Sequence, residues 1–100
     1  MRPMSDENQI PVPPSFVALF VPPGRLKPTE PRAVIAERYE LCEDLAQMLT
    51  ETAQERLHAL GITEADVLER LHRGLLAEGS PVSADEAQWV VTRLAELLQW

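Results

Sequence analysis

Two segments carry residue types at a spacing that could bind metal, Glu55-x-x-His58 and Glu69-x-x-His72. Residues three positions apart on a helix project toward one point, and di-metal carboxylate proteins use this spacing inside helical bundles. Here Leu57 and Leu71 are the expected inward residues, because Glu55 lies about 160° around the helix from Leu57. Two more inward glutamates would also be needed. We therefore expect solvated helix flanks, and a metal-binding helical protein or enzyme is the alternative function.

Other candidates for catalysis are few. The single cysteine, Cys42, cannot form a disulfide within the chain, and its place in an apolar stripe predicts a buried thiol. The sequence offers no Ser-His-Asp, Cys-His or paired-carboxylate pattern that supports nucleophilic or acid-base chemistry. We therefore predict no catalytic residue, no bound metal or cofactor, and a protein that is not an enzyme.

A row near the C-terminus has the chemistry of a binding surface. Trp89, Arg93, Glu96 and Trp100 are spaced by four, three and four residues, so they share one side of a helix. Tryptophan and arginine are enriched in binding hot spots. The row is expected roughly 160° from the core stripe of that helix, which is Ala87, Val91, Leu94 and Leu98. We predict that Trp89, Arg93 and Trp100 bind a partner; the alternatives are that an N-terminal arm buries both rings or that Trp100 frays.

The element that must position everything else is a long helix predicted over residues 31–60. Thr29 and Glu30 can cap it, Pro31 suits its first turn, and Gly61 suits a left-handed end. At 1.5 Å per residue it is roughly 45 Å long. One face carries the main core stripe: Ile35, Tyr39, Cys42, Ala46, Leu49, Ala53, Leu57 and Leu60.

The same helix has a second apolar row and an acidic row. The apolar row is Val34, Leu41, Leu45 and Met48. The acidic row is Glu37, Glu40, Asp44, Glu51 and Glu55, the usual pattern of a solvated face, which could alternatively steer a basic partner. An apolar arc this wide predicts more than two neighbours. We expect Val34, Leu41 and Met48 to contribute to a partner surface.

Two shorter helices follow, and their starts are marked by capping boxes. Thr63 with Asp66 opens a helix predicted over residues 64–78, and Ser83 with Glu86 opens one predicted over residues 84–99. Short connections between three helices indicate an antiparallel up-down-up arrangement. The predicted fold is therefore all-α, an antiparallel three-helix bundle over residues 31–100 with one long first helix.

A proline-rich N-terminal segment precedes the bundle. Residues 1–14 are predicted to be a mobile tail, and residues 15–30 an apolar arm packing on the bundle. Within the arm, residues 16–21 favour a short helical turn or an extended arm over a strand, because no second strand is available. The two short helices leave the first half of the long helix bare. The arm folding back over it is the simplest cover, and a second copy of the chain is the alternative.

The charge distribution bounds the partners. The chain carries a net charge of −7. Residues 1–32 have four basic and three acidic side chains, so residues 33–100 carry −8. An acidic body repels phosphate, which excludes nucleic acid and anionic membrane surfaces as favoured partners. No segment approaches the ~20 apolar residues of a membrane span, and the expected location is cytoplasmic.

Three stretches resemble a known family: Pro14-Ser15-Phe16, Pro22-Pro23-Gly24-Arg25 and Arg38-Tyr39-Glu40-Leu41-Cys42-Glu43-Asp44. They are similar to a family of small uncharacterised bacterial proteins, some of whose relatives are labelled ATPase with chaperone activity. An ATPase of the common kind needs a glycine-rich loop ending in Lys and Ser or Thr. The only lysine, Lys27, follows no such loop. Together these features predict a non-enzymatic interaction module, an adaptor or small chaperone-like partner, that binds a protein or forms a homodimer.

Overall fold

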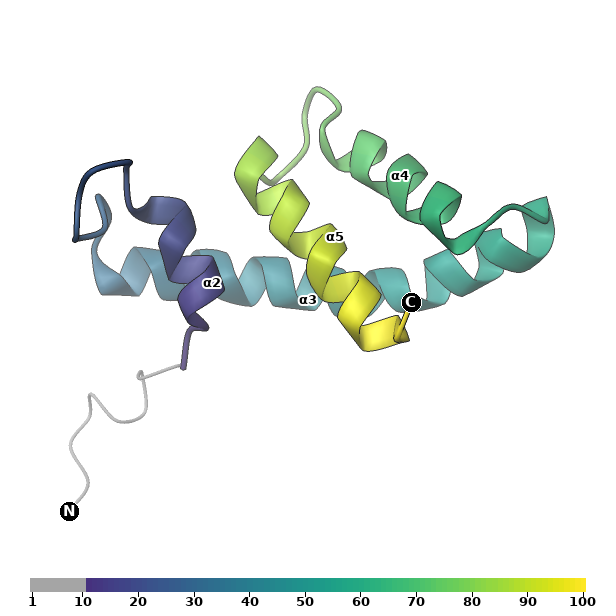
Figure 1. Cartoon of the computed structure of the whole chain (residues 1–100), viewed down its shortest axis with the longest axis horizontal. Helices are drawn as coiled ribbons and strands as arrows, with labels where there is room; N and C mark the ends of the chain where they lie inside the picture. The colour runs from purple at the N-terminus through teal and green to yellow at the C-terminus, as the bar shows by residue number, and fades with distance from the viewer. Residues whose placement is uncertain (1–10) are drawn as a thin grey trace, which may run out of the picture. The chain divides into compact units, whose positions relative to one another are not determined.

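The computed structural model describes residues 11–100, and all regular structure in them is helical (Figure 1). The elements are α2 (Pro14–Val17), the 3-10 helix η1 (Ala18–Phe20), α3 (Arg32–Leu60), α4 (Glu64–Leu75) and α5 (Ala84–Leu98). Residues 11–40 belong to one compact unit and Leu41–Trp100 form a second. Helix α3 contributes to both units, which are described separately. The all-α prediction is confirmed for the described residues.

The first unit is built on one aromatic residue of the N-terminal segment. Phe16 is completely buried in α2, and its ring lies 5.5 Å from that of Phe20 and 5.7 Å from that of Tyr39 on α3, the latter edge to face. The backbone N–H of Thr29 donates to the carbonyl of Phe20 at 2.8 Å, which closes the loop between η1 and α3. Of the two conformations expected for residues 16–21, a helical turn or an extended arm, the structure has helical turns over Pro14–Val17 and Ala18–Phe20.

Two predicted details of the N-terminal segment differ from the structure. The expected tail was residues 1–14; residues 1–10 lie outside the described residues, and Pro14 already begins α2. Proline suits this position because its fixed φ is helical and its missing N–H is not needed there. Thr29, predicted to cap α3, also directs its side-chain hydroxyl to the Phe20 carbonyl, at 3.3 Å. Helix α3 then begins at Arg32, one residue after the predicted start.

Helix α3 ends where the sequence predicts it to. The N–H of Gly61 donates to the carbonyl of Leu57 at 3.1 Å, and Gly61 has a φ of 62°. Glycine takes this left-handed conformation without the steric cost that a Cβ would impose. The predicted core stripe fails only at this end, because Leu60 is 51% exposed. Leu57, in the same last turn, still packs on the core of the second unit.

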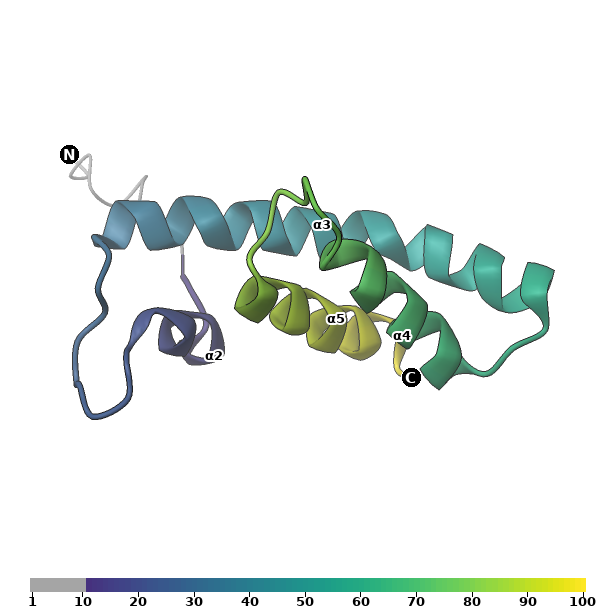
Figure 2. The same cartoon turned by 90° about the horizontal axis from the view of Figure 1, so that it is seen from above.

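The core of the second unit joins α3, α4 and α5. Ala53 of α3, Val67 and Leu71 of α4, and Leu94 of α5 form one buried cluster. Partly buried apolar side chains pack around it: Leu49, Leu57, Ile62, Leu68, Leu98 and Trp100. Helices α4 and α5 lie side by side, as both views show (Figures 1 and 2). Burying apolar surface in this shared cluster holds the two short helices on α3.

Helix α4 is shorter than predicted. It starts at the Thr63 cap, whose side chain accepts a hydrogen bond from the N–H of Asp66, but it ends at Leu75 and not at residue 78. The N–H of Leu76 donates to the carbonyls of both His72 and Arg73, which tightens the last turn. Such three-residue bonds commonly close a helix. Residues 76–80 then form turns instead of another helical turn.

Helix α5 has the predicted capping box: the backbone N–H of Ser83 donates to Oε1 of Glu86 at 2.9 Å, and the backbone N–H of Glu86 donates to Oγ of Ser83 at 3.1 Å. Its buried side includes Ala87, Val90 and Leu94, which are all expected to line it. Val90 and Leu94 are completely buried, whereas Val91 is only half-buried. Each residue of a helix points about 100° away from the one before it. The burial of Val90 therefore extends the buried side of α5 toward Arg93. The helix ends at Leu98, one residue before the predicted end.

Candidate interaction surface

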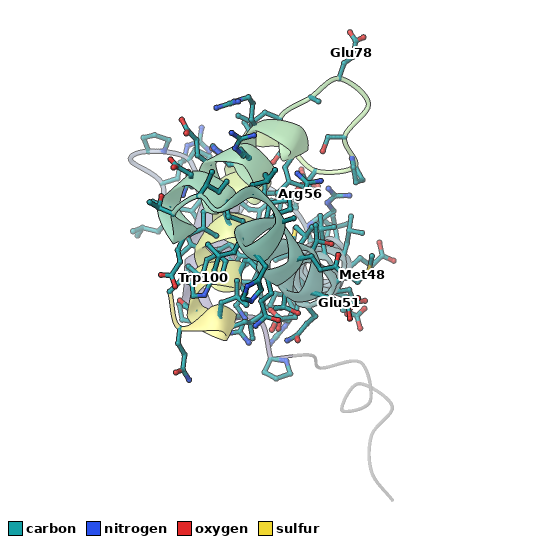
Figure 3. All side chains as sticks on the ribbon, turned by 90° about the vertical axis from the view of Figure 1, so that its right-hand side faces the viewer. Met48, Glu51, Arg56, Glu78 and Trp100 are labelled. Carbon is teal, nitrogen blue, oxygen red and sulfur yellow. The ribbon has the colours of Figure 1, made fainter. Side chains whose placement is uncertain are left out.

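The second unit leaves large apolar side chains on the outward side of α3. Leu41 is 37% exposed and Met48 is 69% exposed, while Leu45 between them is half-buried. These three residues, spaced by four and three positions, are called the outward row below. In the view along α3, Met48 and Glu51 point to one side of the helix and Trp100 lies on the other (Figure 3). The outward row is therefore not covered by α4 or α5.

The residues on the opposite face of α3 explain why α4 and α5 pack there and leave the outward row uncovered. Its fully buried residues in the second unit are Cys42, Ala46 and Ala53, all of them small. Small side chains let a neighbouring helix approach closely. In this part of α3 the larger apolar residues Leu41 and Met48 face outward. Leu49 and Leu57 pack partly buried around the core cluster, so α3 carries large apolar residues on both sides.

Acidic side chains border the outward row. Asp44, Glu51 and Glu55 are all exposed, and none of them belongs to an ion pair found among the described residues. The second unit as a whole contains eleven acidic and four basic residues, a net charge of −7. These carboxylates therefore add to a negative potential around an apolar strip.

Arg93 has a partner within its own unit. Its Nε donates to Oε1 of Glu43 at 2.9 Å and its Nη2 donates to Oε2 at 3.1 Å, a two-pronged bond from α5 to α3. Figure 2 shows α5 running beside the middle of α3, where this bond forms. Nη1 of Arg93 also donates to Glu96 at 3.1 Å on its own helix. The predicted orientation of this row away from the core is therefore wrong at Arg93.

The bond to Arg93 changes the acidity of Glu43. The hydrogen bonds from the guanidinium hold the pKa of Glu43 below its ordinary value of 4.5, against the opposing effect of burial, and Gln47 adds a further donor at 2.9 Å. The same bond raises the pKa of Arg93. Each partner therefore stabilises the charged form of the other, as expected for a charge-assisted pair. Their side chains are only 33% and 18% exposed.

The two tryptophans of this row are half-buried. Trp100 packs on the core cluster of the second unit, and its backbone N–H donates to the carbonyl of Ala95 at 3.0 Å. Trp89 is also half-buried. Arg93 and Trp100 therefore make contacts within their own unit, and the most exposed predicted contact residue is Met48.

Val34, the remaining predicted contact residue, lies in the first unit and is 36% exposed. The first unit also contains a half-open recess of about 410 Å³ that the sequence did not predict. Its walls come from both ends of the N-terminal loop and the start of α3: Val12, Val17, Pro28, Glu30, Arg32 and Ile35. The recess is mostly apolar, with one carboxylate and one guanidinium. No pattern in the sequence joins residues 12–17 to residues 28–35; only the folded loop does.

The two Glu-x-x-His segments do not form a site. Glu55, His58 and Glu69 are exposed and His72 is half-buried. Glu69 lies 3.6 Å from Arg73 on its own helix, in a pair that is largely solvated. Within residues 11–100, no group of three His, Cys, Asp or Glu side chains lies close enough together to hold a metal ion. Glu55, His58 and Glu69 therefore lie on solvated flanks, whereas His72 is partly covered.

Comparison with protein-family models, with curated proteins and with solved structures finds no match to this chain. The class that the structure itself defines is an all-helical protein. In the part of the chain that the structure describes, no helix combines the length and the apolar character needed to cross a membrane.

Proposed function

We propose that the chain is a non-enzymatic interaction module, an adaptor or small chaperone-like partner, which binds another protein through the outward row of α3. The observation that carries this proposal is the 69% exposure of Met48, two turns after the 37% exposed Leu41, within the long helix α3. An apolar strip costs free energy in water, at roughly 25 cal/mol for each Å² left exposed. A partner that covers the row recovers that free energy.

The proposal extends to the architecture that presents the row. We infer that α3, α4 and α5 form an antiparallel three-helix bundle in the second unit, supported by their shared core cluster. In this arrangement α4 and α5 take up the side of α3 with small residues and leave Leu41 and Met48 to solvent. The acidic charge of the unit makes a protein partner in the cytoplasm a better candidate than nucleic acid or an anionic membrane surface.

The kind of contact follows from the side chains. Met48 is unbranched and its thioether is polarizable, so it adapts to different apolar surfaces. Leu41 and Leu45 are held by the helix backbone and present a fixed edge. A surface of this kind suits an elongated apolar segment of a partner, because its three residues follow one another along α3.

Photo-crosslinking in the native host tests the proposal. A photoreactive amino acid at position 48 should capture a protein that is not captured from position 78, because Glu78 is an exposed residue in the loop after α4. Adding the Leu41→Ser substitution should reduce capture from position 48 without changing the melting temperature. Equal capture from positions 48 and 78, or none from either, would refute the proposed function.

A further inference from the structure

We propose that the partner segment seated on the outward row is a cationic amphipathic helix. This inference rests on the proposed function and adds the chemistry of the occupant. Its grounds are the spacing of the apolar residues, the charges beside them and the unsuitability of a second copy of this chain, each argued in turn below.

The spacing of the row favours a helix as the occupant. Leu41, Leu45 and Met48 follow one another by four and three residues, the d-a-d spacing of a heptad repeat. A helix with this pattern presents its side chains as knobs that fit between those of a second helix. Leu41 and Met48 are seven positions apart, which is about 10 Å along α3. A partner helix of three to four turns would cover it and reach the flanking charges.

The charges beside the outward row determine which sign of charge a partner helix needs. With Leu41 and Met48 at d positions, Asp44 and Glu51 occupy the g positions, which lie at the edge of a helix pair. Both carboxylates are exposed. Basic residues on the facing edge of a partner helix can pair with them, and the field of a unit with a net charge of −7 increases the rate of encounter.

A second copy of this chain fits the same edge poorly. In an antiparallel pair, g positions face g positions, so Asp44 and Glu51 would oppose the same acidic residues of the other copy. In a parallel pair, the g position of Asp44 faces the following e position, which is Leu49, a residue packed on the core cluster. Neither arrangement supplies a basic side chain. The acidic edge therefore selects against self-association through this row.

Two synthetic peptides test the inference on the full chain. Both are 21-residue amphipathic helices with the same leucine stripe; one carries lysine beside the stripe and the other carries glutamate. The lysine peptide should bind, measured by calorimetry, and the glutamate peptide should not. Leu41→Ser with Met48→Ser should weaken the binding of the lysine peptide about tenfold or more, because it removes most of the exposed apolar area of the row.

The charge contribution has its own variant and control. Asp44→Asn with Glu51→Gln should weaken the binding of the lysine peptide about three- to tenfold at low salt and have little effect at high salt. Glu69→Gln with Glu78→Gln removes the same number of charges away from the row and should change binding less than twofold. Circular dichroism and melting of each variant show whether the fold is retained.

Other outcomes overturn the inference. Equal binding of the two peptides, or equal losses in the two charge variants, would show that the row does not select a cationic helix. A dimer in analytical ultracentrifugation that Met48→Ser converts to monomer would show that a second copy occupies the row. If photo-crosslinking at position 48 captures a partner whose bound segment is neutral or acidic, the cationic helix is wrong and the interaction module stands. If position 48 captures nothing, both fail.

Discussion

Replacing Arg93 or Glu43 should destabilise the second unit mainly through the bond between the two side chains. Their nitrogen and oxygen atoms lie 2.9 and 3.1 Å apart in two parallel contacts. With an effective dielectric constant of about 20, unit charges about 4 Å apart attract by roughly 4 kcal/mol. Ordering the two long side chains costs about 2–3 kcal/mol. The net coupling is then about 1–2 kcal/mol, above the usual value for a fully exposed ion pair.

A double-mutant cycle measures this coupling. Arg93→Met, Glu43→Gln and the combined variant are unfolded in urea at neutral pH, and the coupling is the non-additive part of the change in unfolding free energy. The pair Arg73 and Glu69 is the control, because its side chains are 70% and 68% exposed and its atoms are 3.6 Å apart. Its coupling should be roughly 0.3–0.5 kcal/mol or less. Additive effects at Arg93 and Glu43, within about 0.3 kcal/mol, would refute the reasoning.

The pH dependence of the coupling has a defined sign. Hydrogen bonds from Arg93 place the pKa of folded Glu43 below its ordinary value of 4.5. The unfolded chain therefore binds the proton more readily, and the stability from this pair is complete above the ordinary pKa. It is lost as the pH falls through the lower pKa of the folded state. Repeating the cycle in acid should show a declining coupling, and a coupling that stays constant down to the acid limit of folding would contradict this account.

Three further predictions each concern one residue, and urea unfolding checks the first two. Trp100→Ala should lower the unfolding free energy by about 1–3 kcal/mol, since the half-buried ring packs on the core cluster; an unchanged value would place the ring in water. Gly74→Ala should raise it by about 0.5–1 kcal/mol, because Gly74 is helical and nothing lies within 4 Å of an added Cβ; a loss would show a hidden close contact. The fully buried thiol of Cys42 should resist a thiol reagent until urea unfolds the chain, and rapid labelling of the native protein would contradict that burial.

The sequence predicted the beginnings of α4 and α5 because their signals are local. The Ser83 and Glu86 bonds and the Thr63 cap are made within three residues, so side-chain type and spacing decide them. The end of α3 was predictable for the same reason, since Gly61 stands alone after a long run without glycine or proline. These local signals of helix starts and ends predict the all-α class and the order of the helices. They require no knowledge of tertiary packing.

The rotation of α5 depends on contacts that the sequence does not show. Val90 and Val91 are adjacent and equally apolar, so periodicity alone leaves a choice between two core sides about 100° apart. The structure buries Val90 completely and brings Arg93 to Glu43, fifty residues earlier. One signal was present: Glu43 directly follows the buried Cys42, at the edge of the core stripe where a charged residue needs a partner. The negative charge of Glu43 could therefore have suggested that an arginine lies opposite it.

Side-chain volume on α3 connects the fold to the proposed function. A helix with Cys42, Ala46 and Ala53 on its buried side makes a thin core, because these residues contribute little apolar volume. The core of the second unit then depends on large residues from α4, α5 and the last turns of α3. Leu41 and Met48 would strengthen that core if they faced it, yet the helical repeat holds them outside. Since their exposure costs free energy that an inward position would recover, the partner proposed above would account for their position on the outward side of α3.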